Sequence, residues 1–175
     1  MELSKMDRHA IEKKVTDWLS AYGYSFEHGQ DIDIVKFARH HGFIVGNAVL
    51  DDNDDGFLAI HPRRAKGKVI GVNSNRSLEW KRFIIAHELA HFALHYDGKQ
   101  VYLHREHKSG RNDTENEADY FAAALLMPRE SFRRVYETLR EDGLSGKVLV
   151  KSLAEKFIVP VESAERRIPE VGIDV

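Results

Sequence analysis

Apolar residues recur at helical spacing through the first forty residues of the chain. The first helix is predicted over residues 6–21, where four apolar residues fall on one face: Ile11, Val15, Trp18 and Leu19. A second apolar stripe lies within "DIDIVKFARHHG", which Asp31 or Asp33 can cap and which Gly42 ends. Each of these helices is therefore expected to bury one face against a core.

The pattern changes from helical to strand-like after residue 42. "FIVGNAVL" (43–50) is typical of a strand, and "FLAIH" (57–61) and "KVIGVN" (68–73) indicate two more, joined by the turn "PRRAKG" (62–67). The simplest arrangement of the last two is an antiparallel hairpin. The acidic segment "DDNDDG" (51–56) is interpreted as a turn, because it lacks the spacing and the distal glutamate of a calcium loop.

Helical patterns then return. One long helix is predicted over about Leu78–His95, and another over about Thr114–Leu126, ending before Pro128. The residues between them, 97–112, are polar, and we expect them to form a loop.

The C-terminal part of the chain is also predicted to be helical. "RESFRRVYETLRED" forms one helix closed by Gly143, and "KSLAEKFIVPVESAERRI" forms two short helices around the turn "IVP". The order of the elements is typical of an α+β fold. We expect a main domain over residues 1–142 and a small helical extension over 143–175 that packs on it.

Composition and charge exclude several classes of protein. The length of 175 residues fits one domain with a small appendage, and a formal net charge of −2 does not favour binding to nucleic acid. The absence of cysteine excludes disulfides, thiolate catalysis and cysteine-ligated zinc. Neither a membrane span nor the apolar run of a signal peptide is present, so we expect a cytoplasmic protein without membrane contact.

The segment "AHELAHFALH" contains an HExxH motif within an apolar helix. His87 and His91, four residues apart, lie about 40° apart on the helix surface, so one face presents two imidazoles to a tetrahedral Zn²⁺. Glu88 lies about 100° from His87, where it can take a proton from a water molecule that the metal activates. The motif thus supplies two ligands and one general base.

The third ligand has several candidates in the sequence. His95 lies about 12 Å along the axis from His87 and is expected to pack or to cap the helix end. Asp97 would serve only if the chain turned back, and the glycine that such a turn needs is absent. Glu115 projects close to the apolar face of the later helix, whereas Glu117 projects towards solvent and is the fallback. Asp119, one turn after Glu115, can hydrogen-bond a ligand histidine.

Two other features bear on the chemistry. Five residues are candidates for stabilising an oxyanion, and the residues alone do not choose among them: Tyr96, Tyr102, His104, His107 and Tyr120. The cluster "HPRRAKGK" is interpreted as a solvated hairpin turn, although its basic residues can also attract an acidic partner or a phosphate.

"WKRFIIAHELAHFALH" followed by "ENEADYFAAALLMP" resembles the ImmA/IrrE family of zinc metallopeptidases, which occur in bacteria and on mobile elements. Both motifs match in the family's order, and the similarity extends over about two-thirds of the chain. The resemblance implies a small zincin-like core, in which a short, mostly antiparallel sheet packs on the HExxH helix and on the helix that carries the third ligand. It also implies a helix-turn-helix-like C-terminal segment.

The resemblance further implies a set of roles. His87, His91 and Glu115 would be the zinc ligands, Glu88 the general base, and Asp119 a residue at a position where the family often has Asn or Asp. Members of the family typically cleave or otherwise inactivate a helix-turn-helix repressor, often one encoded next door. The chain departs from the family pattern at Pro160, where serine is usual.

Three functions follow as hypotheses. The first is a zinc-dependent endopeptidase that acts on a specific regulatory protein, a helix-turn-helix repressor. The second is a non-catalytic, zinc-stabilised module that sequesters a repressor or an antitoxin-like partner. The third, direct DNA binding, is disfavoured because Pro160 and Pro169 interrupt the C-terminal pattern and acidic residues offset its basic ones.

Overall fold

A four-stranded sheet lies along one side of the molecule in the computed structural model, which describes residues 5–28, 31–107 and 113–173. Its strand order is β1-β3-β2-β4, with β1 parallel to β3 and the other neighbours antiparallel. The strands cover Ile44–Ala48 (β1), Asp54–Ile60 (β2), Lys68–Asn73 (β3) and Tyr102–His107 (β4). The α+β class and the mostly antiparallel sheet are confirmed.

The predicted hairpin is present as β2 and β3. Its register pairs Leu58 with Ile70, both fully buried, and burial alternates along β2 as a period of two requires. The acidic turn is shorter than predicted, because β2 already begins at Asp54. Asp54 is itself buried, and its carbonyl accepts a hydrogen bond from the Asn73 side chain.

Seven α-helices are present in the described part of the chain. They cover Lys5–Tyr22 (α1), Ile34–His40 (α2), Leu78–Ala90 (α3), Asp113–Leu126 (α4), Arg129–Glu141 (α5), Gly146–Phe157 (α6) and Val161–Glu170 (α7). A short 3-10 turn, η1, covers Phe26–His28. Asp33, not Asp31, caps α2 by accepting a hydrogen bond from the Lys36 amide at 3.0 Å. None of the helices in the described ranges combines the length and the apolar character that crossing a bilayer requires.

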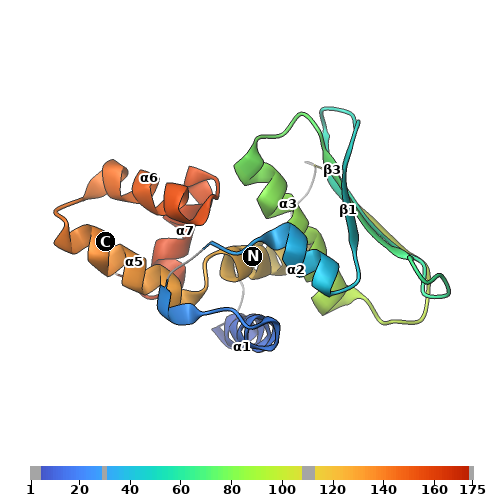
Figure 1. The fold of residues 1–175 in the computed structure, drawn as a ribbon, viewed down its shortest axis with the longest axis horizontal. Helices are drawn as coiled ribbons and strands as arrows, with labels where there is room; N and C mark the ends of the chain where they lie inside the picture. The colour runs from blue at the N-terminus through green and yellow to red at the C-terminus, as the bar shows by residue number, and fades with distance from the viewer. Residues whose placement is uncertain (1–4, 29–30, 108–112, 174–175) are drawn as a thin grey trace.

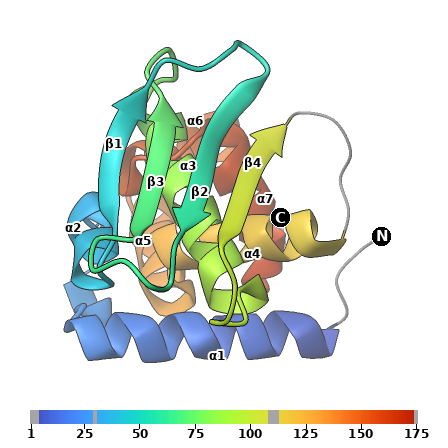
Figure 2. The same cartoon turned by 90° about the vertical axis from the view of Figure 1, so that its right-hand side faces the viewer.

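The helices are arranged in layers behind the sheet. Figure 2 shows the sheet facing the viewer, with α3 and α4 behind it and α1 running along its lower edge. Figure 1 shows α5, α6 and α7 on the side away from the sheet. Helix α3 packs on both α4 and the sheet, so its buried apolar residues lie at the centre of the core. Leu89 and Phe121, for example, are completely buried there.

Helix α3 ends in a π-helical turn, η2, over His91–His95. The turn is widened to an i→i+5 hydrogen bond, in which the Tyr96 amide donates to the His91 carbonyl at 3.1 Å. His95 is the last residue of this turn.

The prediction of a loop over 97–112 is wrong for residues 102–107, which form β4. This strand pairs with β2, and His104 is opposite Leu58. Its inward positions carry polar or amphipathic side chains, Tyr102 and His104, while Leu103 is 67% exposed. The usual alternation of apolar-in and polar-out is therefore reversed, and the strand could not be recognised by hydrophobicity.

The predicted C-terminal helices, α6 and α7, are joined at residues 158–160. Ile158 has a left-handed φ of 50°, and its carbonyl accepts a hydrogen bond from Arg82 of α3 at 3.0 Å. Arg167 of α7 is fully buried, lies 2.8 Å from Glu12 of α1 and donates to the Met127 carbonyl. The C-terminal helices are thus joined to α1 and α3 by buried polar contacts. The division at residue 143 stays a prediction.

Candidate metal centre

Two histidines on one face of α3 form the base of the site. His87 and His91 are almost completely buried, and their Nε2 atoms lie 3.0 Å apart. The helical spacing of four residues brings the two rings together, as the sequence predicted. Burial lowers the pKa of His91, and the charges of His87 and His104 lower it further, although a hydrogen bond to Glu115 acts in the opposite direction. The neutral form, which can ligate a metal, is therefore favoured.

Glu115 reaches the same point from the first turn of α4. Its Oε2 atom lies 3.1 Å from Nε2 of His87 and 3.6 Å from Nε2 of His91. Donor atoms that surround a tetrahedral zinc ion at its usual bond lengths are roughly 3.3 Å apart. The three separations match this value, so His87, His91 and Glu115 form a group that can hold a metal ion.

Asp119 supports His87 from the other side of the ring. Its Oδ1 atom lies 3.0 Å from Nδ1 of His87, one turn along α4 from Glu115. Because a carboxylate only accepts, Nδ1 of His87 carries the proton, and Nε2 keeps its lone pair for a metal. This carboxylate–histidine arrangement orients ligands in many zinc sites. The arrangement agrees with the role predicted for Asp119.

His95 and Glu117 form a matching support for His91. Nδ1 of His91 lies 3.1 Å from Nδ1 of His95, and Nε2 of His95 lies 3.0 Å from Oε2 of Glu117. When His95 is neutral, it donates to Glu117 and accepts from His91, which again leaves Nε2 of His91 free for a metal. Glu117, predicted to project towards solvent, is 33% exposed and also accepts a hydrogen bond from His95.

Glu88, the proposed base, lies completely buried beside this group. Its Oε2 atom accepts a hydrogen bond from Nδ1 of His104 at 3.1 Å. Within the described residues its Oε1 atom is buried without a hydrogen-bond partner. An unpaired buried carboxylate oxygen is costly in free energy, and such groups concentrate at functional sites.

His104 of β4 connects the two carboxylates. Its Nδ1 faces Glu88, its Nε2 lies 3.2 Å from Oε1 of Glu115, and its ring lies over His91 with 3.7 Å between centroids. Burial alone would lower the pKa of His104, but hydrogen bonds to Glu115 and Glu88 and the charges of both carboxylates raise it to about 9. The same hydrogen bond from His104, together with those of His87 and His91, holds the pKa of Glu115 well below its usual range.

The other residues considered from sequence lie elsewhere or remain undescribed. Tyr120 donates to Glu12 at 3.0 Å, and Tyr96 stacks on Phe92. Asp97 accepts from the Lys99 amide and is outside the metal-binding group, and the side chain of His107 lies outside the described part. Among the oxyanion candidates, His104 is therefore the one whose ring contacts both Glu88 and Glu115. From the sequence, only its position opposite β2 would distinguish His104 from the other candidates. That position can be predicted only after β4 has been recognised as a strand.

Comparison with known proteins shows the fold and the family of this chain. A solved structure named Mycobacterium tuberculosis transcriptional regulator is similar to this chain with a TM-score of 0.58 and 22% identity, which indicates a shared fold. The similarity covers 91% of this chain and 46% of that one, so the chain spans less than half of that regulator. No curated protein matches the sequence significantly.

The family model for the IrrE N-terminal-like domain, Peptidase M78, matches residues 30–169. This range contains the whole metal-binding group as well as Glu88 and His104. The chain therefore belongs to the IrrE N-terminal-like family of M78 peptidases.

Proposed function

We propose that the protein is a zinc-dependent endopeptidase that cleaves a specific regulatory protein. The observation that carries the proposal is the position of Glu88, a fully buried carboxylate that shares the ring of His104 with Glu115 of the metal-binding group. A structural metal site is closed by its ligands and needs no such base. Membership of a peptidase family supports the same reaction class.

Zinc is the metal that best matches the donor atoms. Two imidazole nitrogens and one carboxylate oxygen, with a fourth position left for water or substrate, are the ligands of many catalytic zinc sites, and the chain contains no cysteine. A bound zinc ion would supply Lewis-acid polarisation of the scissile carbonyl and would lower the pKa of a water molecule towards neutrality.

The residues around the metal-binding group have separate roles in the proposed reaction. Glu88 accepts a proton from the attacking water and passes it to the leaving amine. Its hydrogen bond with His104 fixes the orientation of its carboxylate at the buried end of the site. His104 carries N–H donors on both ring nitrogens, because both face carboxylates that can only accept. Both donors are engaged in these contacts, so His104 holds the carboxylates of Glu88 and Glu115 in position.

The substrate class is proposed from the family. A peptidase of the IrrE N-terminal-like family is expected to act on a protein, and the motif resemblance favours a helix-turn-helix repressor encoded next to the gene. The test is a cleavage assay on the purified neighbouring repressor, with added zinc and with a chelator. We expect the zinc-loaded chain to convert the intact repressor into two fragments, chelation to stop the cleavage, and added zinc to restore it. An intact repressor under zinc-loaded conditions would contradict this choice of substrate.

A further inference from the structure

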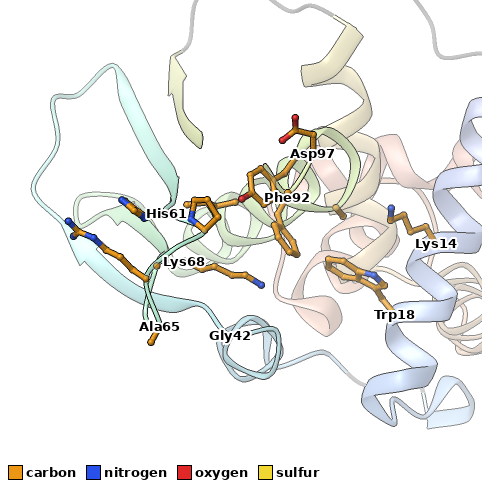
Figure 3. Close-up of a pocket in the computed structure, with 15 residues that line it drawn as sticks. Lys14, Trp18, Gly42, His61, Ala65, Lys68, Phe92 and Asp97 are labelled. Atoms are coloured by element: carbon orange, nitrogen blue, oxygen red, sulfur yellow. The ribbon is translucent and has the colours of Figure 1, made fainter. Parts of the chain in front are cut away.

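A second concave site lies at the end of α3, bordered by the turn between β2 and β3. It is a pocket of ≈ 700 Å³, a volume typical of sites for small molecules. Figure 3 shows Lys14 and Trp18 of α1 on one side, His61, Ala65 and Lys68 on the other, and Phe92 between them. None of the residues that line this pocket belongs to the metal-binding group. The proposed peptidase reaction therefore leaves the pocket unexplained.

Positive charge dominates the lining of the pocket. Lys14, Arg64 and Lys68 line it together with a single acidic residue, Asp97. None of the three basic side chains forms an ion pair with a carboxylate of the described residues. Lys68 donates to the His41 carbonyl at 3.2 Å, and its Nζ lies 4.4 Å from the Phe92 ring centroid. Three cations without an ion pair among the described residues, Lys14 from α1 and Arg64 and Lys68 from the β2–β3 hairpin, produce a potential that attracts an anion.

The basic turn is held in one shape before any ligand binds. The His61 amide donates to the Gly67 carbonyl at 2.7 Å, and the Arg64 amide donates to the His61 carbonyl at 3.1 Å. A Cβ atom at Gly67 would lie 2.1 Å from the His61 carbonyl oxygen, so the turn can close only with glycine there. The backbone of the turn is thus fixed by hydrogen bonds, while residues 62–66 are exposed, as the interpretation of a solvated turn predicted.

Aromatic rings form the apolar part of the wall. The Trp18 and Phe92 ring centroids are 6.3 Å apart, and Phe92 stacks on Tyr96 at 5.8 Å. On its other side Trp18 stacks on His41 at 4.4 Å, which fixes the plane of the indole. The Phe92 ring is inclined at 47° to the indole and already contacts Lys68 and Tyr96. Trp18 therefore supplies the aromatic surface against which one flat ring can pack.

We propose that this pocket binds a small molecule that combines a phosphate group with a flat ring, of the class of nucleoside monophosphates. The phosphate lies among Lys14, Arg64 and Lys68. With the negative charge of Asp97 included, the lining carries a net charge of +2, which balances the charge of about −2 on a phosphate monoester. The guanidinium of Arg64 supplies the paired N–H donors that suit phosphate oxygens. The base of the ligand packs on Trp18.

Calorimetric titration of the full chain with AMP tests this site without reference to peptidase activity. We expect saturable binding, with an affinity that falls about tenfold in Lys14→Ala and again in Arg64→Ala, because each loses a charge-assisted contact. Lys66→Ala is the matched control, since Lys66 is exposed on the same turn but does not line the pocket. Its affinity for AMP should equal that of the unsubstituted chain.

Adenosine and inorganic phosphate separate the two parts of the ligand, and both should bind more weakly than AMP. Fluorescence provides a second measurement, because Trp18 and Trp80 are the only tryptophans and Trp80→Phe leaves Trp18 as the reporter. AMP should change that signal. Absence of saturation with millimolar AMP, equal weakening by Lys66→Ala, or equal affinity for adenosine or phosphate alone would overturn the proposal. None of these results bears on whether the chain is a peptidase.

Discussion

Nδ1 of His104 lies 3.1 Å from Oε2 of Glu88, although one residue belongs to the edge strand β4 and the other to the last turn of α3. The contact connects the sheet to the proposed base, and Glu115 occupies the other ring nitrogen. A histidine held between two carboxylates keeps its second proton, which explains the direction of its pKa shift.

This arrangement makes the stability of the metal-free protein depend on pH. The pKa of His104 rises from 6.5 to about 9 on folding, so its stabilising effect is complete below pH 6.5 and is lost as the pH rises through about 9. The free energy of unfolding, measured by denaturant titration, should therefore decrease across this window. His104→Gln should remove most of the decrease. A variant that keeps the full slope would show that another group titrates there.

Asp119 should control the affinity for the metal through His87. Asp119→Ala removes the acceptor of the His87 Nδ1 proton and is expected to weaken zinc binding about 10- to 100-fold in a chelator competition assay. Asp113→Ala changes an exposed acid at the start of the same helix and should leave the affinity unchanged. Equal effects of both substitutions would point to the general charge of α4 in place of the specific contact.

The pair of His95 and Glu117 should act in the same way through His91. His95→Phe keeps an aromatic ring but removes the acceptor, and we expect zinc affinity to fall about tenfold. Glu117→Gln keeps an oxygen that can accept a hydrogen bond from His95, so this substitution should lower the zinc affinity less. If His95→Phe binds zinc as tightly as the unsubstituted chain, the pair only packs against the helix end.

The sequence was sufficient for the parts of this site that lie on regular helices. The i, i+4 spacing of His87 and His91 and the angular position of Glu115 relative to its apolar face both follow from helix geometry alone. The π-helical turn that carries His95 could not be foreseen in this way, and neither could the contact between His95 and Glu117.

The contribution of the sheet was harder to predict. His104 sits in a strand whose inward residues are polar because they face the site, so hydrophobic alternation gave no signal for it. The phosphate pocket depends on three segments far apart in the chain. Its basic turn was visible in the sequence, but nothing there indicated that Trp18 and Phe92 would lie opposite it.

Gly56 provides a test of the packing between the sheet and α3. A Cβ atom there would lie 2.5 Å from Cγ2 of Ile84 and 2.9 Å from the Gly71 carbonyl oxygen, so Gly56→Ala should destabilise the fold by roughly 1–3 kcal/mol. Gly46→Ala, in a strand position with open space around it, should be neutral or slightly stabilising. Thermal unfolding of both variants measures the difference. Equal melting temperatures would mean that β2 is less closely packed on α3 than described.

The central claim is that Glu88 is the base of a peptidase, and Glu88→Gln tests it most directly. Zinc content and cleavage of the neighbouring repressor should be measured on the same sample of this variant. We expect zinc to remain at the level of the unsubstituted chain, because His87, His91 and Glu115 are intact, and cleavage to fall at least about 100-fold. Cleavage at an unchanged rate, or release of the repressor from its operator by the variant without any cut, would contradict the claim and identify the chain as a binding module.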